Sequence, residues 1–163
     1  MFKSLQVKLV TIFVLIVLAI MTVAGTFLVL RVSDFYHESF YSQRSSVFQD
    51  GSISRIKEPD ELDEALKKKS ADIGISNWRN YYIVNADDRS IVYASHKATT
   101  DVYLDSDNFI GALSGATGDR KDATGKYLDY AVPVKCDGGL HIVYIKDTKE
   151  VEKFFNDTVK VLD

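Results

Sequence analysis

The sequence has few of the residues that mark a disulfide-rich, collagen-like or disordered chain. Its 163 residues include one cysteine, two prolines and nine glycines. The single cysteine, Cys136, cannot form an internal disulfide, so the fold depends on its hydrophobic core. Hydrophobic residues make up 46% and charged residues 26%, which is typical of about one globular domain. The formal net charge of −3 argues against electrostatic binding of nucleic acid.

Motifs for catalysis, nucleotide binding and metal binding are also missing. Residues 118–127 resemble a phosphate loop, but the spacing is two residues off and Tyr127 stands where a hydroxyl ligand for magnesium belongs. Residues 111–115 lack the serine position of a nucleophile elbow. The acids within 101–107 lack the glycine and terminal glutamate of a calcium loop. The histidines have no second ligand at zinc spacing: His37, His96 and His141. We expect no catalytic residues, no metal and no cofactor.

The longest apolar run lies near the N-terminus. Leu9–Leu30 contains 22 residues without an ionisable side chain. As a helix it would span about 33 Å, against a hydrocarbon core of roughly 30 Å. Its polar side chains are three threonines, whose hydroxyls can bond back to helix carbonyls. This run predicts a transmembrane helix over 9–30.

The charges on either side of this run predict its orientation. Lys3 and Lys8 precede it, so residues 1–8 are expected in the cytoplasm and residues 31–163 outside. The alternative is a cleaved signal peptide, but the run is longer than the 7–15 residues typical of such a peptide. After Arg31 there remain 17 basic and 23 acidic residues, a formal charge of −6 typical of a soluble domain.

Two further segments have apolar residues at helical spacing before the pattern changes to that of strands. Residues 32–57 keep an amphipathic period that Gly51 is expected to interrupt. Proline and acids followed by lysines predict a short helix over 59–72. Later, residues 105–113 predict another short helix, capped by Asp105 or Asp107.

Two strand pairs are expected. Residues 78–84 and 90–95 alternate around a polar turn and predict a β-hairpin. Residues 126–135 and 140–146 predict a second hairpin, with the turn at 136–139. Cys136 is expected to be a loop residue of this turn, and the alternative is an intermolecular disulfide or a redox role. Pro133 cannot donate to a ladder, so it should face an edge or a bulge. An apolar stripe then predicts a terminal helix over 148–162.

These strings resemble the extracytoplasmic PAS-like (PDC or Cache) sensor domains of bacterial receptor kinases, most closely the WalK/PhoR type of sensor histidine kinase. Residues 81–95 resemble the family's first hairpin, and 130–135 with 140–145 resemble its closing strands. Residues 5–10 resemble the start of such kinases. The resemblance implies an α+β fold, a PAS-like antiparallel sheet with a long N-terminal helix on one face and a ligand pocket on the other.

The resemblance also implies site residues and partners. A small ligand would lie between the sheet and residues 97–123. The candidate lining residues are aromatic or polar: Tyr82, Tyr93, His96, Phe109, Tyr127, Tyr130 and Tyr144. The terminal helix would relay the signal through four apolar residues: Val151, Phe154, Phe155 and Val159. Family members are dimeric and continue through a second span into kinase regions, so a second span is expected after Asp163.

The expected function is therefore that of a membrane-anchored, extracytoplasmic signal-sensing domain of a two-component histidine kinase. It would bind a small ligand or an extracytoplasmic protein, and would not bind nucleic acid. The input domain of a chemoreceptor or diguanylate cyclase would have a similar exported half. A secreted binding protein or small exported enzyme is the third possibility, in which the apolar run is removed.

Overall fold

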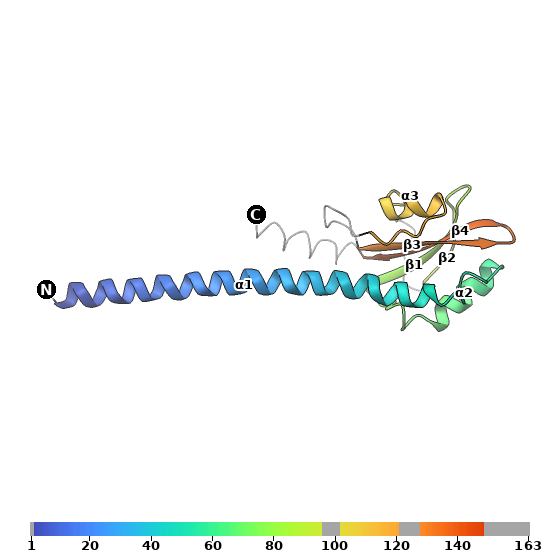
Figure 1. The fold of residues 1–163 in the computed structure, drawn as a ribbon. Helices are drawn as coiled ribbons and strands as arrows, with labels where there is room; N and C mark the ends of the chain where they lie inside the picture. Colours follow the sequence, from blue (N-terminus) through green and yellow to red (C-terminus); the bar gives the residue numbers. More distant parts are fainter. Residues whose placement is uncertain (1, 96–101, 121–127, 149–163) are drawn as a thin grey trace. The chain divides into compact units, whose positions relative to one another are not determined.

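The computed structural model describes residues 2–95, 102–120 and 128–148 (Figure 1). The chain divides into two compact units, one up to Tyr36 and one from His37 onward. Helix α1 (Phe2–Gln49) contributes to both units. The remaining elements belong to the second unit, in the order α2, β1, β2, α3, β3 and β4.

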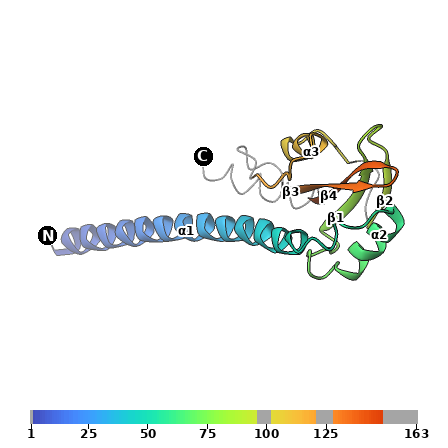
Figure 2. The ribbon, with the colours of Figure 1, turned by 45° about the vertical axis from the view of Figure 1, so that its right-hand side comes forward.

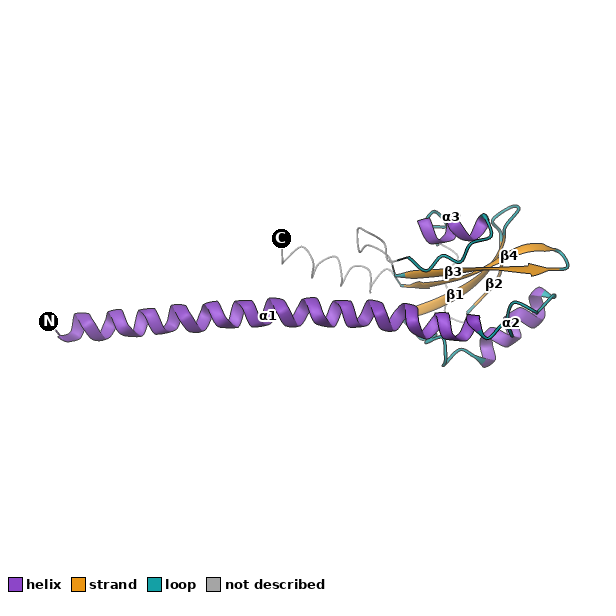
Figure 3. Ribbon diagram, in the orientation of Figure 1, coloured by secondary structure: helices purple, strands orange, loops and turns teal. Residues whose placement is uncertain are grey.

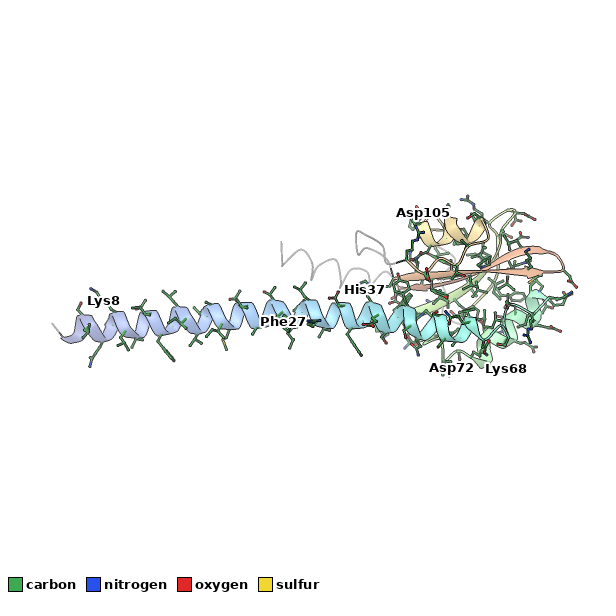
Figure 4. The ribbon with its side chains drawn as sticks, viewed as in Figure 1. Lys8, Phe27, His37, Lys68, Asp72 and Asp105 are labelled. Carbon is green, nitrogen blue, oxygen red and sulfur yellow. The ribbon has the colours of Figure 1, made fainter. Side chains whose placement is uncertain are left out.

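The first unit is the N-terminal part of α1. The side chains of the apolar run project from it in different directions, with Phe27 labelled in Figure 4 and 59% exposed. Thr11, Thr22 and Thr26 each donate a hydrogen bond to the carbonyl four residues earlier, at 2.8–2.9 Å, as the sequence predicts. By length and composition α1 could cross a membrane, and none of its most apolar stretch is buried.

The sheet of the second unit consists of two antiparallel hairpins that lie side by side (Figure 3). The first hairpin is β1 (Arg79–Asn85) with β2 (Ile91–Ala94), and the second is β3 (Asp129–Cys136) with β4 (Gly139–Asp147). Because β1 also pairs with β4, the strand order is β2-β1-β4-β3. Both predicted hairpins and the α+β class with an antiparallel sheet are confirmed.

The second hairpin differs from the prediction at its turn. Cys136 is the last residue of β3, pairs with Gly139 and is only 8% exposed. The prediction of a loop cysteine was therefore wrong. Burial and nearby acids raise the pKa of the Cys136 thiol above its ordinary value, which disfavours the reactive thiolate.

Pro133 lies on an edge strand, as expected. Its neighbour Ala131 exchanges two backbone hydrogen bonds with Gly118, at 2.8 and 2.9 Å, on the side away from β4. Backbone groups two residues apart on a strand point the same way, so the Pro133 nitrogen also faces away from β4. The sheet therefore loses no ladder hydrogen bond at this proline.

The two short helices form where the sequence predicts them, with different ends. Helix α2 (Pro59–Lys68) ends four residues earlier than expected, and turns lead to Gly74, whose φ of +70° favours glycine. Helix α3 (Asp107–Leu113) begins at an N-cap Ser106, whose hydroxyl accepts a bond from the Phe109 amide at 3.1 Å. The predicted aspartate cap was wrong. A serine with an extended backbone can accept a hydrogen bond from an amide of the first helical turn, as an aspartate can.

The sheet has a different apolar layer on each face (Figures 1 and 2). Helix α3 covers one face, called here the α3 face. Its core cluster is Tyr82, Val84, Phe109, Ala112, Ala131, Ile142 and Tyr144. The residues of α1 from His37 onward and α2 cover the other face, where the Phe48 and Tyr130 rings lie 5.7 Å apart. Successive side chains alternate between faces, so each strand contributes to both layers.

The predicted terminal helix over 148–162 lies almost wholly outside the described residues. Within the described chain, Thr148 follows β4, and its amide donates to the Trp78 carbonyl at 2.7 Å. This bond extends the β1–β4 end of the sheet by one residue on each strand.

Candidate functional site

A row of buried polar side chains crosses one end of the α3 face. In the strand register, Asn80 and Asp129 both pair with Lys146. Because side chains alternate along a strand, these three residues share a face with Tyr82 and Tyr144. The exposed fractions of Asn80, Asp129 and Lys146 are 5%, 1% and 8%. An otherwise apolar face therefore carries an amide, a carboxylate and a lysine in neighbouring positions.

Asp129 connects this row to helix α3. One carboxylate oxygen accepts a hydrogen bond from Asn108 Nδ2 at 2.8 Å, and the other accepts one from the Tyr144 hydroxyl at 3.0 Å. The same hydroxyl lies 3.3 Å from the Oγ of Ser106, the α3 N-cap. Hydrogen bonds to a buried carboxylate are among the stronger ones in proteins. Asp129 thus fixes the first turn of α3 on the sheet.

Asn80 connects the row to the end of the first hairpin. Its Oδ1 accepts a hydrogen bond from the Ser95 hydroxyl at 2.8 Å, and the Tyr81 amide donates to that hydroxyl oxygen at 3.3 Å. Ser95 is 8% exposed. We call the whole set the polar cluster: Asn80, Ser95, Ser106, Asn108, Asp129, Tyr144 and Lys146.

Asn108 also holds the segment that follows α3. Its side-chain amide donates to the Arg120 carbonyl at 2.8 Å and accepts from the Arg120 amide at 2.9 Å. Gly118 lies against the same asparagine, since a Cβ there would be 2.2 Å from the Asn108 carbonyl oxygen. Glycine is required at 118 because the two backbones approach closely. Residues 118–120 are thereby tied to both α3 and β3.

The chemistry of the polar cluster suits binding or rearrangement. Both oxygens of Asp129 accept hydrogen bonds from donors on α3 and β4, so a group that takes over either bond would weaken the attachment of α3 to the sheet. Among the described residues, no group of three or more histidines, cysteines and acids could hold a metal ion. The hydrogen bonds of the polar cluster therefore hold α3 on the sheet, and breaking them would release α3.

The structure brings together three of the predicted ligand residues. Tyr82, Phe109 and Tyr144 belong to the core of the α3 face, where the ring centroid of Tyr144 lies 6.5 Å from that of Tyr82 and 5.3 Å from that of Phe109. His96 and Tyr127 lie outside the described residues. So do the four predicted relay residues: Val151, Phe154, Phe155 and Val159.

Tyr93 and Tyr130 do not join this group, because strand alternation directs them to the opposite face. The Tyr93 hydroxyl donates to Asp60 of α2 at 2.8 Å, and this bond raises its pKa. Tyr130 packs on Phe48 of α1, and burial raises its pKa to about 12. Tyr93 and Tyr130 therefore face α2 and α1, away from Tyr82, Phe109 and Tyr144, and do not line a site beneath α3 as was expected.

Sequence reasoning missed the polar residues of the cluster. Asn80, Asn108, Asp129 and Lys146 looked like ordinary surface residues because polar side chains are usually exposed. A signal was present: a tight turn after Cys136 places Asp129 opposite Lys146 in the second hairpin. That register, combined with alternation, puts both charges on the face of Tyr144.

Comparisons with protein-family models, with curated proteins and with solved structures find no match to this chain.

Proposed function

We propose that this chain is the membrane-anchored, extracytoplasmic sensing region of a two-component sensor histidine kinase. The observation that carries the proposal is that one chain joins two unlike parts. An exposed apolar helix of membrane-spanning length is followed by an α+β unit with a buried polar cluster. In water such a helix would expose apolar side chains on every side, whereas lipid accommodates it.

The sheet supports a PAS-like identity for the α+β unit. Two hairpins pair through β1 and β4, and α3 lies between them in the chain and covers one face. The residues of α1 from His37 onward cover the other face. This matches the arrangement that the resemblance implies, with the polar cluster on the face where the family binds ligands.

The proposed mechanism is a shift between two arrangements of α3. In one, Asn108 and Tyr144 donate to Asp129 and hold α3 closed on the sheet. A small ligand or an extracytoplasmic protein that engages these groups favours a second arrangement in which the bonds are exchanged. A ligand shifts such an equilibrium only through its different affinity for the two states. The proposal includes a homodimer and a second span after Asp163.

The kinase assignment is tested by the coding sequence that follows Asp163. We expect an apolar run of about 20 residues and then a phosphoacceptor helix and an ATP-binding region. A methyl-accepting or diguanylate cyclase region would make the chain an input domain of another receptor class. A stop codon would contradict the kinase proposal.

The sensing role is tested by output from the complete receptor. Asn108→Ala removes the amide that fastens α3, so we expect the receptor to lose its normal regulation and to signal constitutively or not at all. Ile110→Ala is the matched control, because Ile110 lies on the same helix and is 44% exposed. Equal, normal regulation in both variants would contradict a sensing role for the polar cluster.

A further inference from the structure

The other face of the sheet carries a second polar group directly behind the polar cluster. Arg79 and Asp147 pair in the register, each one residue away from Asn80 and Lys146 of the polar cluster. Arg79 donates to Asp147 through Nε and through Nη2, the latter at 3.1 Å. The Asp147 side chain is 1% exposed and that of Arg79 is 12% exposed. This ion pair therefore joins the ends of β1 and β4 on the face of the sheet that α1 covers.

The ion pair contacts α1 through an aromatic ring. The Arg79 guanidinium carbon lies 4.6 Å from the ring centroid of Phe40, which is 2% exposed. Arg44, one turn further along α1, stacks on the same ring at 3.7 Å. A desolvated cation over an aromatic face is attracted more strongly than an exposed one. Two arginines, one from the helix and one from the sheet, thus share one ring.

Both guanidinium groups also converge on Gly74. A Cβ built there would lie 3.1 Å from Nη1 of Arg79 and 3.3 Å from Nη2 of Arg44. Arg44 is fully buried, and its Nη2 donates to the Ile73 carbonyl at 3.2 Å. The turn after α2 is therefore shaped around the two arginines.

We propose that Phe40, Arg44, Arg79 and Asp147, the arginine cluster, couple α1 to the sheet end that bears the polar cluster. Asn80 and Lys146 face α3, while their chain neighbours Arg79 and Asp147 face α1. A change in the polar cluster that displaces the ends of β1 and β4 must displace the arginine cluster with them. As a relay, this inference rests on the proposed sensing function, but the physical coupling does not.

Hydrogen exchange of the complete chain in detergent micelles tests the coupling. Asp147→Asn removes one charge of the pair, and we expect about tenfold faster exchange of the amides of residues 37–49. Exchange in α3 should change less than about twofold, because Asn108 and Tyr144 still hold α3 to Asp129. Asn108→Ala disturbs the polar cluster itself, so it should accelerate exchange in α3 and, through the ends of β1 and β4, also in residues 37–49.

The matched control is Asp137→Asn. Asp137 pairs with Lys57 at 3.9 Å on the surface, with side chains 64% and 73% exposed, so the same chemical change should leave exchange unaltered. If Asp147→Asn prevents folding, Arg79→Lys retains the charge but loses the bidentate fork and the flat stacking group. It should accelerate exchange in the same α1 segment.

Three results would overturn the coupling: Asp147→Asn gives no faster exchange in residues 37–49, Asp147→Asn accelerates α1 and α3 equally, which signals general destabilisation, or Asn108→Ala accelerates α3 alone. None of these results depends on whether the chain belongs to a kinase. Conversely, loss of the kinase assignment would leave the exchange pattern as predicted. A receptor with Asp147→Asn that binds but no longer responds would support the relay itself.

Discussion

The hydroxyl of Tyr41 donates a hydrogen bond to the backbone carbonyl of Arg120, 3.0 Å away and 79 residues later in the chain. The same carbonyl accepts a bond from Asn108 Nδ2 at 2.8 Å. Tyr41 belongs to α1 and Asn108 to α3, which cover opposite faces of the sheet. The segment 118–120 passes along the outer edge of β3 and so connects the two layers around that edge.

Removing the Tyr41 hydroxyl should weaken this connection slightly. We expect Tyr41→Phe to lower the free energy of unfolding by about 0.5–1 kcal/mol, because a solvent-accessible hydrogen bond contributes modestly. Urea denaturation measures the change. A loss above about 3 kcal/mol would show that Tyr41 has a larger role than this bond gives it.

Gly118 should tolerate no side chain. Gly118→Ala places a Cβ 2.2 Å from the Asn108 carbonyl oxygen, so α3 and the segment after it must separate. We expect a loss of about 3 kcal/mol of unfolding free energy. Gly111→Ala is the control: it lies in α3 with open space around it and should be neutral or stabilising by about 0.5–1 kcal/mol. Equal effects of the two changes would contradict the close approach.

Stability should fall in alkali through Tyr130. Burial raises its folded-state pKa to about 12, whereas an unfolded tyrosine titrates near 10. The stabilisation is therefore complete below pH 10 and is lost as the pH rises toward 12. The slope for one group is at most about 1.4 kcal/mol per pH unit. Tyr81 and Tyr93 also have raised pKa values, so Tyr130→Phe should reduce the slope of unfolding free energy in this window without abolishing it. An unchanged slope would refute the assignment.

Removing one or the other partner of the buried hydrogen bond between Tyr81 and Asp63 should lower the free energy of unfolding by different amounts. The Tyr81 hydroxyl donates to Asp63 at 2.7 Å, and Lys67 also contacts that carboxylate. Asp63→Ala leaves a buried hydroxyl without its acceptor and should cost about 2–3 kcal/mol. Tyr81→Phe leaves Asp63 with Lys67 and should cost about 1 kcal/mol. Thermal unfolding of both variants decides the order, and a larger loss for Tyr81→Phe would contradict this account.

Local chemistry made most of the fold predictable. Alternating aromatic and β-branched residues located β1 and β4, proline and acids located the start of α2, and Pro133 marked an edge. The ends of helices were less predictable where several neighbouring residues could serve as the N-cap. Ser106 is the N-cap of α3, although Asp105 or Asp107 was expected in that position. A buried strand end at Cys136 likewise looked like a turn because Asp137 and Gly138 follow it.

The polar cluster was harder to predict because it is made by contacts between distant segments. Asn108 and Asp129 are 21 residues apart, and neither sits in a motif. Likewise Arg79 and Asp147 are 68 residues apart and meet only through the pairing of β1 with β4. Hydropathy predicts that such residues are exposed, and only the sheet register shows that they are buried.

The most direct test of the central claim is the side of the membrane on which each end of α1 lies. In a Cys136→Ser background, Ser4→Cys and Lys57→Cys place single thiols at exposed positions on either side of the apolar run. A membrane-impermeant maleimide applied to intact cells should label Lys57→Cys and should label Ser4→Cys only after lysis. Labelling of both positions in intact cells, or of neither, would contradict a membrane-anchored domain that faces outward.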